Sequence, residues 1–535
     1  MRKIFTAVFL CLILSAFAAA PPRGDARLRE LVVFPEMNLS FNFGLDLQGN
    51  EWVVSKNVDL PSEISRLREE LKQQPNDIER LLQLGNLLDS NGQTNESQSC
   101  YQKAEQFCRS KVAVNPQDGL NLTDLAEALL ELGKHAEAES VYRRATLVSS
   151  NEWRCWARLG NFLANDFNFL LFPENLRGQI VPAQMPSQEV LDYRPSAGAL
   201  KKSESQCSEA SRCFDRAVAL APKEPEVFFQ RAGYMSISNW QNCFFRYYRD
   251  NEKIDSTTWL SAFFSKETIA NLQRAADLSP KNCDYISLVA YFTSANAMIQ
   301  ARVTNYTPDM LPDAARKSIH NTMTRLENLS EVSDKRAAAG ALENLGVLNF
   351  VFGSSQAAAA DFRQVISLDP TREQSWDMLL GTLKDSASPG ELVAICESRL
   401  KNKNSARNHL LLAKAFQRQK TWDKAIEQAE IAGKLETNNI VPPLMLAAIA
   451  LKQSADTNQI STALKYLTPA EELLKTMPAN DETRTRWHEL MLNVAIACGL
   501  EGTQDSQKLA RSYLEAVLKS YPDDKDAEEI MRALE

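Results

Sequence analysis

The sequence predicts an all-α protein in which short helix–turn–helix units stack one after another as an α-solenoid. The clearest unit spans residues 339–372, which read as two short amphipathic helices. Gly346 and Ala358 lie twelve positions apart, one in each helix, and such small residues let two antiparallel helices cross closely. Phe362 follows Ala358 by four positions and is expected to fill the wider part of the wedge. Pro370 then ends the second helix, because proline has no amide hydrogen to donate.

The same register recurs along the chain, with one small residue in each first helix and two marker positions, four apart, in each second helix. In the third and fourth sets below, extra residues separate the two helices, so the twelve-residue spacing is lengthened there. The recurring sets are Gly85, Ser97 and Tyr101; Ala126, Ala138 and Tyr142; Gly160, Ala210 and Phe214; Ala232, Thr268 and Leu272; and Ala413, Ala425 and Ala429. This register resembles the tetratricopeptide repeat (TPR), a 34-residue helix–turn–helix unit. The resemblance covers residues 61–535 and implies a TPR-like α-solenoid, a right-handed superhelix of helix–turn–helix repeats.

Residues 1–18 are typical of a secretory signal peptide. Basic residues at positions 2 and 3 precede an apolar run from Ile4 to Phe17, and small residues around Ala18 suit cleavage. No later stretch is apolar for long enough to cross a bilayer, so we expect no transmembrane segment in the mature chain. The expected location is the periplasm or the secreted fraction.

Residues 19–60 differ from everything that follows. From Leu39 to Leu47 apolar and polar residues alternate, which is the period of a strand with one buried face. A turn at 48–50 and a second apolar stretch within Glu51–Lys56 complete a predicted short N-terminal β-hairpin. A lone hairpin is marginal in water, so it should dock on the first helices or pair with a partner strand.

The helical part begins with a lead-in helix from Pro61 to Gln74 and ends with a charged cap at 523–535. Three units are longer than the repeat allows, and the extra residues fall between their first and second helices. These insertions are 166–203, 239–265 and 303–312, and the stack is expected to place them along one rim.

The second insertion is dense in aromatic residues for a loop. They are Trp240, Phe244, Phe245, Tyr247, Tyr248 and Trp259. Exposed aromatic clusters often mark contact surfaces, which makes this rim a candidate partner-binding surface. The alternative is that each insertion folds back and buries its own aromatic side chains as a small cluster.

The resemblance also implies a binding face, because the first helices of such repeats line a concave groove that receives a peptide or a partner helix. The groove candidates are Asn86, Glu127, Asn161, Glu343, Val347, Phe350 and Lys414. Asn86 and Asn161 match a position that is often asparagine in the family, where the amide can hold a bound peptide backbone. The alternative is that asparagine is frequent there whether or not a ligand binds.

Composition and motifs favour binding over catalysis. Removal of Arg2 and Lys3 takes the formal charge from −8 to −10, and no basic stripe suggests a nucleic-acid partner. The four histidines lie in different predicted helices, and no phosphate-binding loop, nucleophile elbow or zinc motif occurs. We therefore expect a non-enzymatic scaffold or adaptor for protein or peptide partners, without a cofactor. The alternative is a carbohydrate- or cell-wall-binding accessory protein that uses the aromatic rim.

Nine cysteines follow the predicted signal peptide. Most fall within helical patterns, where a free thiol behaves as a small apolar residue. An oxidising compartment would also permit disulfides. The best candidate group for a bridge is Cys155, Cys207, Cys213 and Cys243.

Overall fold

The structure is a computed structural model, and every regular element in the part of the chain that it describes is a helix. The described residues are 28–29, 31–34, 60–90, 92–177, 180, 185–301, 311–352, 354–453, 457–477 and 481–534. The all-α prediction is confirmed there. The predicted signal peptide, the β-hairpin between Leu39 and Lys56, and nearly all of the third insertion lie outside the described residues.

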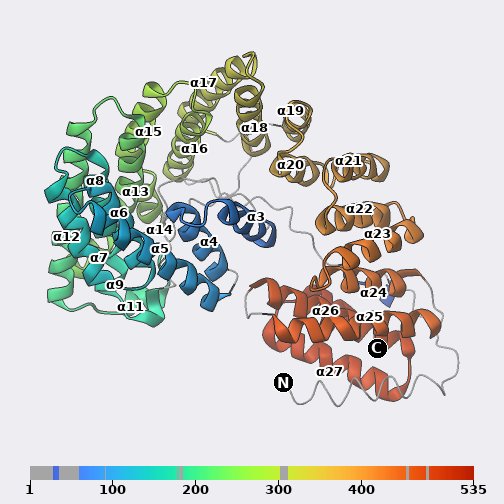
Figure 1. Cartoon of the computed structure of the whole chain (residues 1–535). Helices are drawn as coiled ribbons and strands as arrows, with labels where there is room; N and C mark the ends of the chain where they lie inside the picture. Colours follow the sequence, from blue (N-terminus) through green and yellow to red (C-terminus); the bar gives the residue numbers. More distant parts are fainter. Residues whose placement is uncertain are drawn as a thin grey trace. The chain divides into compact units, whose positions relative to one another are not determined.

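The chain forms two compact units, which are described separately. One comprises residues 40–382, and the other comprises residues 383–535 together with 1–39. Figure 1 colours the first unit from blue through green to brown-yellow and the C-terminal helices of the second in orange and red.

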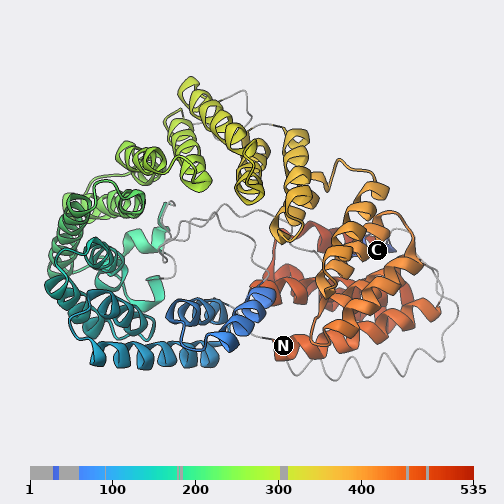
Figure 2. The ribbon, with the colours of Figure 1, turned by 45° about the horizontal axis from the view of Figure 1, so that its top comes forward.

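The first unit is an array of helix pairs that succeed one another along an arc (Figure 2). α4 packs on α5, α6 on α7, α8 on α12, α13 on α15, α16 on α17 and α18 on α19. The helices are α3 (Leu60–Gln73), α4 (Ile78–Ser90), α5 (Thr94–Val114), α6 (Gly119–Glu131), α7 (His135–Val148), α8 (Trp153–Asn165), α9 (Phe167–Leu171), α10 (Glu174–Arg177), α11 (Gln188–Asp192), α12 (Ala197–Leu220), α13 (Pro225–Asp250), α14 (Ser256–Phe263), α15 (Lys266–Leu278), α16 (Cys283–Gln300), α17 (Asp313–Ser330), α18 (Lys335–Phe352), α19 (Ser355–Leu368) and α20 (Glu373–Leu383).

The second unit repeats the same arrangement. α22 packs on α23, α24 on α25 and α26 on α27, while α28 closes the array against α26 and α27. Its helices are α21 (Pro389–Asn402), α22 (Ala406–Arg418), α23 (Trp422–Leu435), α24 (Val441–Gln453), α25 (Thr457–Thr476), α26 (Asp481–Glu501), α27 (Gln504–Ser520) and α28 (Lys525–Ala533). The first helices also touch one another, α22 with α24 and α24 with α26, so they form a continuous face.

Glycines in the first helices allow the two helices of a pair to cross closely, as the sequence predicts. A Cβ atom added to Gly346 would lie 2.7 Å from the Phe362 ring, and one added to Gly160 would lie 2.8 Å from the Phe214 ring. Gly85 is covered in the same way by the ring of Tyr101. The Gly160–Phe214 contact joins α8 to α12, which confirms that these helices form one pair despite the residues between them.

The second insertion is not a loop, and the expectation of a loop at 239–265 is wrong. α13 continues without a break to Asp250, and α14 covers most of the remainder. After Pro225 at its start, α13 contains no proline, so nothing in the sequence stops it. Asn251 caps its C-terminus: this residue adopts the left-handed conformation with a φ of 52° and donates its amide hydrogen to the Arg246 carbonyl.

The two described insertions pack against each other in a large apolar core. Phe167 of α9 lies 5.4 Å from Phe244 and 5.6 Å from Phe245, measured between ring centroids. Phe172, which follows α9, lies 5.5 Å from Phe244. The same core extends into α15 to α18. The insertions therefore complete the fold of the first unit.

Candidate functional site

The predicted aromatic rim is largely internal. Trp240, Phe244, Phe245 and Trp259 have at most 4 % of their surface exposed. They belong to the core just described. They are therefore buried, as the alternative expects, but in a large core shared with the first insertion and with α15 to α18 instead of a small cluster of the insertion itself. Their faces are not available to a partner or a sugar ring in this conformation.

Tyr247 and Tyr248, the other two predicted rim residues, are half-buried near the end of α13. The Tyr248 hydroxyl donates a hydrogen bond of 2.6 Å to the Val190 carbonyl. The Arg194 guanidinium lies over the Tyr247 ring at 5.9 Å. Both tyrosines therefore help to fasten the first insertion to α13.

The structure contains no disulfide bridge among the four candidate cysteines. The nine cysteines that follow the predicted signal peptide all lie within the described residues, and all are free thiols. Cys155 and Cys213 lie in two separate apolar clusters, and Cys207 and Cys243 share a third. The Cys207 thiol donates instead to the side-chain oxygen of Gln241, at 3.4 Å, and the Cys243 thiol to the Asn239 carbonyl. Burial raises the pKa of Cys207 to about 12, so its sulfur stays protonated at neutral pH and is a poor nucleophile.

Two of the three groove candidates near the start of the first unit, Asn86 and Glu127, bond other residues of the chain. The side-chain oxygen of Asn86 accepts a 2.6 Å hydrogen bond from the Tyr101 hydroxyl, which ties α4 to α5. Glu127 of α6 forms an ion pair with Arg158 of α8. Asn161 is half-buried on α8.

Carboxyl groups concentrate around Glu127. Burial raises the pKa of Glu127 to about 7. The charge of Arg158 lowers this pKa, and the charges of Asp124 and Glu131 raise it further. Burial also raises the pKa of Asp124 and of Glu131, and Asp89 adds to the effect on Glu131. This part of the first unit is therefore an acidic, partly desolvated surface. Arg158, which is paired with Glu127, and Lys111, which acts on Asp124, oppose its charge.

Raising the pH from 4.5 to 7 is expected to weaken the local stability of α6 and α8. Because the pKa of Glu127 is higher in the folded state, the folded chain binds more protons than the unfolded chain in this window. The unfolding free energy therefore falls as the pH rises, by at most roughly 3 kcal/mol for a shift from 4.5 to about 7. Amide hydrogen exchange in α6 and α8 at several pH values measures it. Glu127→Gln should flatten the profile, whereas exposed Glu79→Gln should not; an unaltered profile in Glu127→Gln contradicts the prediction.

Three groove candidates, Glu343, Val347 and Phe350, lie on α18 and differ in their burial and contacts. The Glu343 carboxylate accepts hydrogen bonds from Arg372 at 2.6 Å and from the Ser375 hydroxyl at 2.9 Å. It therefore holds the turn between α19 and α20. Val347 is buried, and Phe350 is half-buried. Lys414 on α22, in the other unit, is half-buried.

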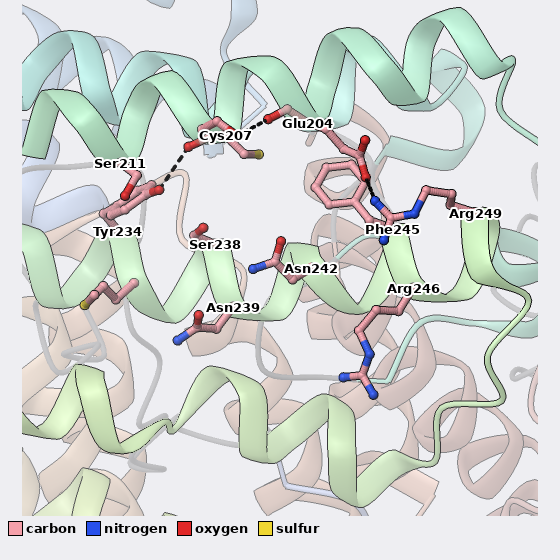
Figure 3. Close-up of a pocket in the computed structure, with 12 residues that line it drawn as sticks. Glu204, Cys207, Ser211, Tyr234, Ser238, Asn239, Asn242, Phe245, Arg246 and Arg249 are labelled. Carbon is pink, nitrogen blue, oxygen red and sulfur yellow. Dashed lines mark hydrogen bonds and ion pairs between the residues drawn. The ribbon is translucent and has the colours of Figure 1, made fainter.

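A pocket of about 710 Å³ opens between α12 and α13 (Figure 3). Its polar wall comprises Glu204, Ser208, Ser211, Ser238, Asn239, Asn242, Arg246 and Arg249. Figure 3 shows Tyr234 pointing to the Cys207 carbonyl, to which its hydroxyl donates a 3.1 Å hydrogen bond.

The charges of this pocket are mostly neutralised. Arg249 pairs with Glu204 and Asp250, and Arg246 pairs with Glu252 through a 2.7 Å bond from Nε. The Asn239 amide donates to the Ser265 hydroxyl at 2.9 Å. The pocket thus offers short hydroxyl and amide groups, which suit a polar chain segment better than an ion.

In the second unit, a segment from near the start of the chain packs on α24 and α26. Residues 28–34, excepting residue 30, lie there. Residues 28 and 29 are helical, residue 31 is in a turn and 32–34 are irregular, and the segment is coloured dark blue beside α24 in Figure 1. The Asn493 side chain of α26 donates to the Val33 carbonyl at 2.7 Å and accepts from the Val33 amide at 3.1 Å. Lys452 at the end of α24 donates to the Arg29 carbonyl at 2.6 Å.

Apolar contacts complete this face. Leu28 and Val32 are 2 % and 7 % exposed and belong to the core of the second unit. A Cβ atom added to Gly499 of α26 would lie 2.9 Å from Leu28. Sequence reasoning identified neither Asn493 nor Lys452. The available signal was the apolar run from Leu31 to Phe34 upstream of the repeats.

Comparison with family models finds repeats in part of this chain. The model of the family described as tetratricopeptide repeat matches residues 78–110 and 121–152, so the chain carries such repeats at α4–α5 and α6–α7. No curated protein matches the sequence. Solved structures with similarity include yeast Tom70, at 15% identity over 90% of this chain and 96% of that one, with a TM-score of 0.30. The Cut9–Hcn1 hetero-tetramer of the APC/C shows 14% identity over 89% and 99%, with a TM-score of 0.27. MamA from Desulfovibrio magneticus RS-1 shows 19% identity over 30% and 88%, with a TM-score of 0.25.

Two further properties bear on the site. Among the described helices, none combines the length and the apolar character that a bilayer crossing requires. Within the same residues, no group of three or more histidine, cysteine or acidic side chains is placed to hold a metal ion.

Proposed function

We propose that this protein is an exported, non-enzymatic scaffold that binds protein or peptide segments on the faces formed by its first helices. Tetratricopeptide repeats suggest a protein–protein interaction scaffold, and residues 1–18 support export to the periplasm or the medium. In a repeat protein each repeat is stabilised by packing on its neighbours. The long surface formed by the first helices can therefore act as a binding surface.

The observation that carries the proposal is the segment on α24 and α26. Asn493 bonds both main-chain groups of Val33, so the amide acts as a neighbouring strand would. This contact involves only main-chain atoms of residue 33, so the backbone of a partner could make it equally well. The face therefore has the chemistry that peptide binding requires.

The carbohydrate-binding alternative loses its main support. It depended on aromatic faces exposed along a rim, and Trp240, Phe244, Phe245 and Trp259 are buried. Sugar rings stack on accessible aromatic faces, which these residues do not offer.

The proposal is tested by site-specific photo-crosslinking in the cells that produce the protein. Benzoylphenylalanine replaces Phe350 on the first helix α18, and in a matched control it replaces exposed Gln364 on the second helix α19. We expect protein adducts at position 350 at least about fivefold more abundant than at position 364. Equal labelling at both positions, or none at either, would contradict the proposal.

A further inference from the structure

We propose that the face of α24 and α26 is a site for an apolar peptide, and that residues 28–34 occupy it as an intramolecular ligand. A partner segment of the same chemistry must displace them before it binds. This inference rests on the proposed scaffold function and gives that function one site and one ligand class.

The first step concerns the main-chain contacts. Asn493 is completely buried, and its two bonds to Val33 satisfy one donor and one acceptor of the amide. A buried amide left without partners costs roughly 1–3 kcal/mol. The site is therefore built to hold a main chain, and an empty site would be unfavourable.

The second step concerns side-chain selectivity. Leu28 and Val32 are four positions apart and both enter the apolar core, while Leu31, Val33 and Phe34 pack against its edge. Gly499 leaves room for both Leu28 and Leu534, because a Cβ atom there would lie 2.9 Å from Leu28 and 2.5 Å from Leu534. The site should therefore select a peptide with branched aliphatic residues four apart and further apolar residues beside and after them.

The third step is the competition. A tethered segment acts at an effective concentration on the order of 1 mM. For a segment with an intrinsic Kd of about 10 µM, the tether would keep the site occupied roughly 99 % of the time. A free peptide of equal intrinsic affinity would then bind about 100-fold more weakly than to an empty site.

The test uses a fluorescent peptide with the sequence of residues 27–35 and measures its anisotropy with the full-length protein. In the variant Leu28→Asp/Val32→Asp the tethered segment should leave, because each substitution would bury an unpaired carboxylate. We expect this variant to bind the free peptide about 100-fold more tightly than the wild type. Adding Asn493→Asp, which removes the donor to the carbonyl but keeps the acceptor, should weaken binding at least tenfold. Asn86→Asp, in the other unit, should have no effect.

Equal peptide affinity for the wild type and the folded double variant would overturn the inference. If the Asp variant loses its helical circular dichroism, Leu28→Ala/Val32→Ala tests the same point with smaller changes. Unfolding of both variants would also overturn it, since the segment would then be an integral part of the core. The crosslinking at Phe350 concerns the other unit, so failure of the peptide to bind leaves that evidence for a scaffold intact, and absence of adducts at 350 leaves the peptide site intact.

Discussion

Replacing Phe244 by alanine is expected to lower the unfolding free energy of the first unit by about 4 kcal/mol. The Phe244 side chain is fully buried, and truncation of such a ring removes its transfer free energy and leaves a cavity. Its ring lies 4.6 Å from Trp259, 5.0 Å from Trp240 and 5.4 Å from Phe167. The cavity would thus open where α9, α13 and α14 meet. Urea unfolding followed by circular dichroism, with hydrogen exchange in α13 and α14, measures the loss.

The matched control is Phe107→Ala on α5 of the same unit. Phe107 is half-buried, so the same change of residue type should cost roughly half as much or less. A cost for Phe244→Ala no larger than that for Phe107→Ala would contradict the assignment of the insertion aromatics to the core. It would instead support the exposed rim that their density in the sequence suggests.

The helix pairs could be predicted because their signal is local. A glycine, a small residue twelve positions later and an aromatic four further on determine how two helices cross, and the Gly346–Phe362 contact bears this out. The split pair was also predictable, since Gly160 and Phe214 keep their chemistry across the intervening residues. Local spacing is therefore sufficient for the repeat architecture.

The insertions could not be predicted in the same way, because their structure depends on contacts between distant residues. The aromatic spacing at 240–248 suits both an exposed face and a buried one. The partners that bury these side chains, Phe167 and Phe172, lie about 70 residues earlier. The 34-residue repeat length also places residues 239–250 outside the repeat, so they were interpreted as part of a loop. No residue among them ends a helix, and α13 continues through them.

The occupied face was missed for a related reason. Asn493 contacts a main chain 460 residues away in sequence, and a main-chain contact leaves no pattern of residue types on the partner segment. Asn86 and Asn161 attracted attention because they match a family position. In the structure the Asn86 side-chain oxygen accepts a hydrogen bond from Tyr101 of its own helix pair, whereas Asn493 bonds the main chain of a segment that is distant in sequence.

Replacing Gly346 by alanine is expected to destabilise the first unit by about 1–3 kcal/mol, although alanine is the better helix former. The added Cβ atom would lie 2.7 Å from Cε1 and 2.9 Å from Cζ of Phe362. Phe362 is fully buried, so its ring can move only by displacing neighbours, and overpacking of this kind is costly. The change is measured by chemical denaturation.

Gly340→Ala is the internal control, because it places the same methyl group in the same helix, α18, where no atom lies within 4 Å. There only the backbone effect remains, and alanine should stabilise the helix by roughly 0.5–1 kcal/mol. The two substitutions should therefore have opposite signs. If both stabilise, Phe362 relaxes freely and the close crossing of α18 and α19 does not depend on glycine. If Gly346→Ala alone destabilises, the wedge repeated at Gly85 and Gly160 is what sets the geometry of these pairs, and larger residues at those positions should separate α4 from α5 and α8 from α12.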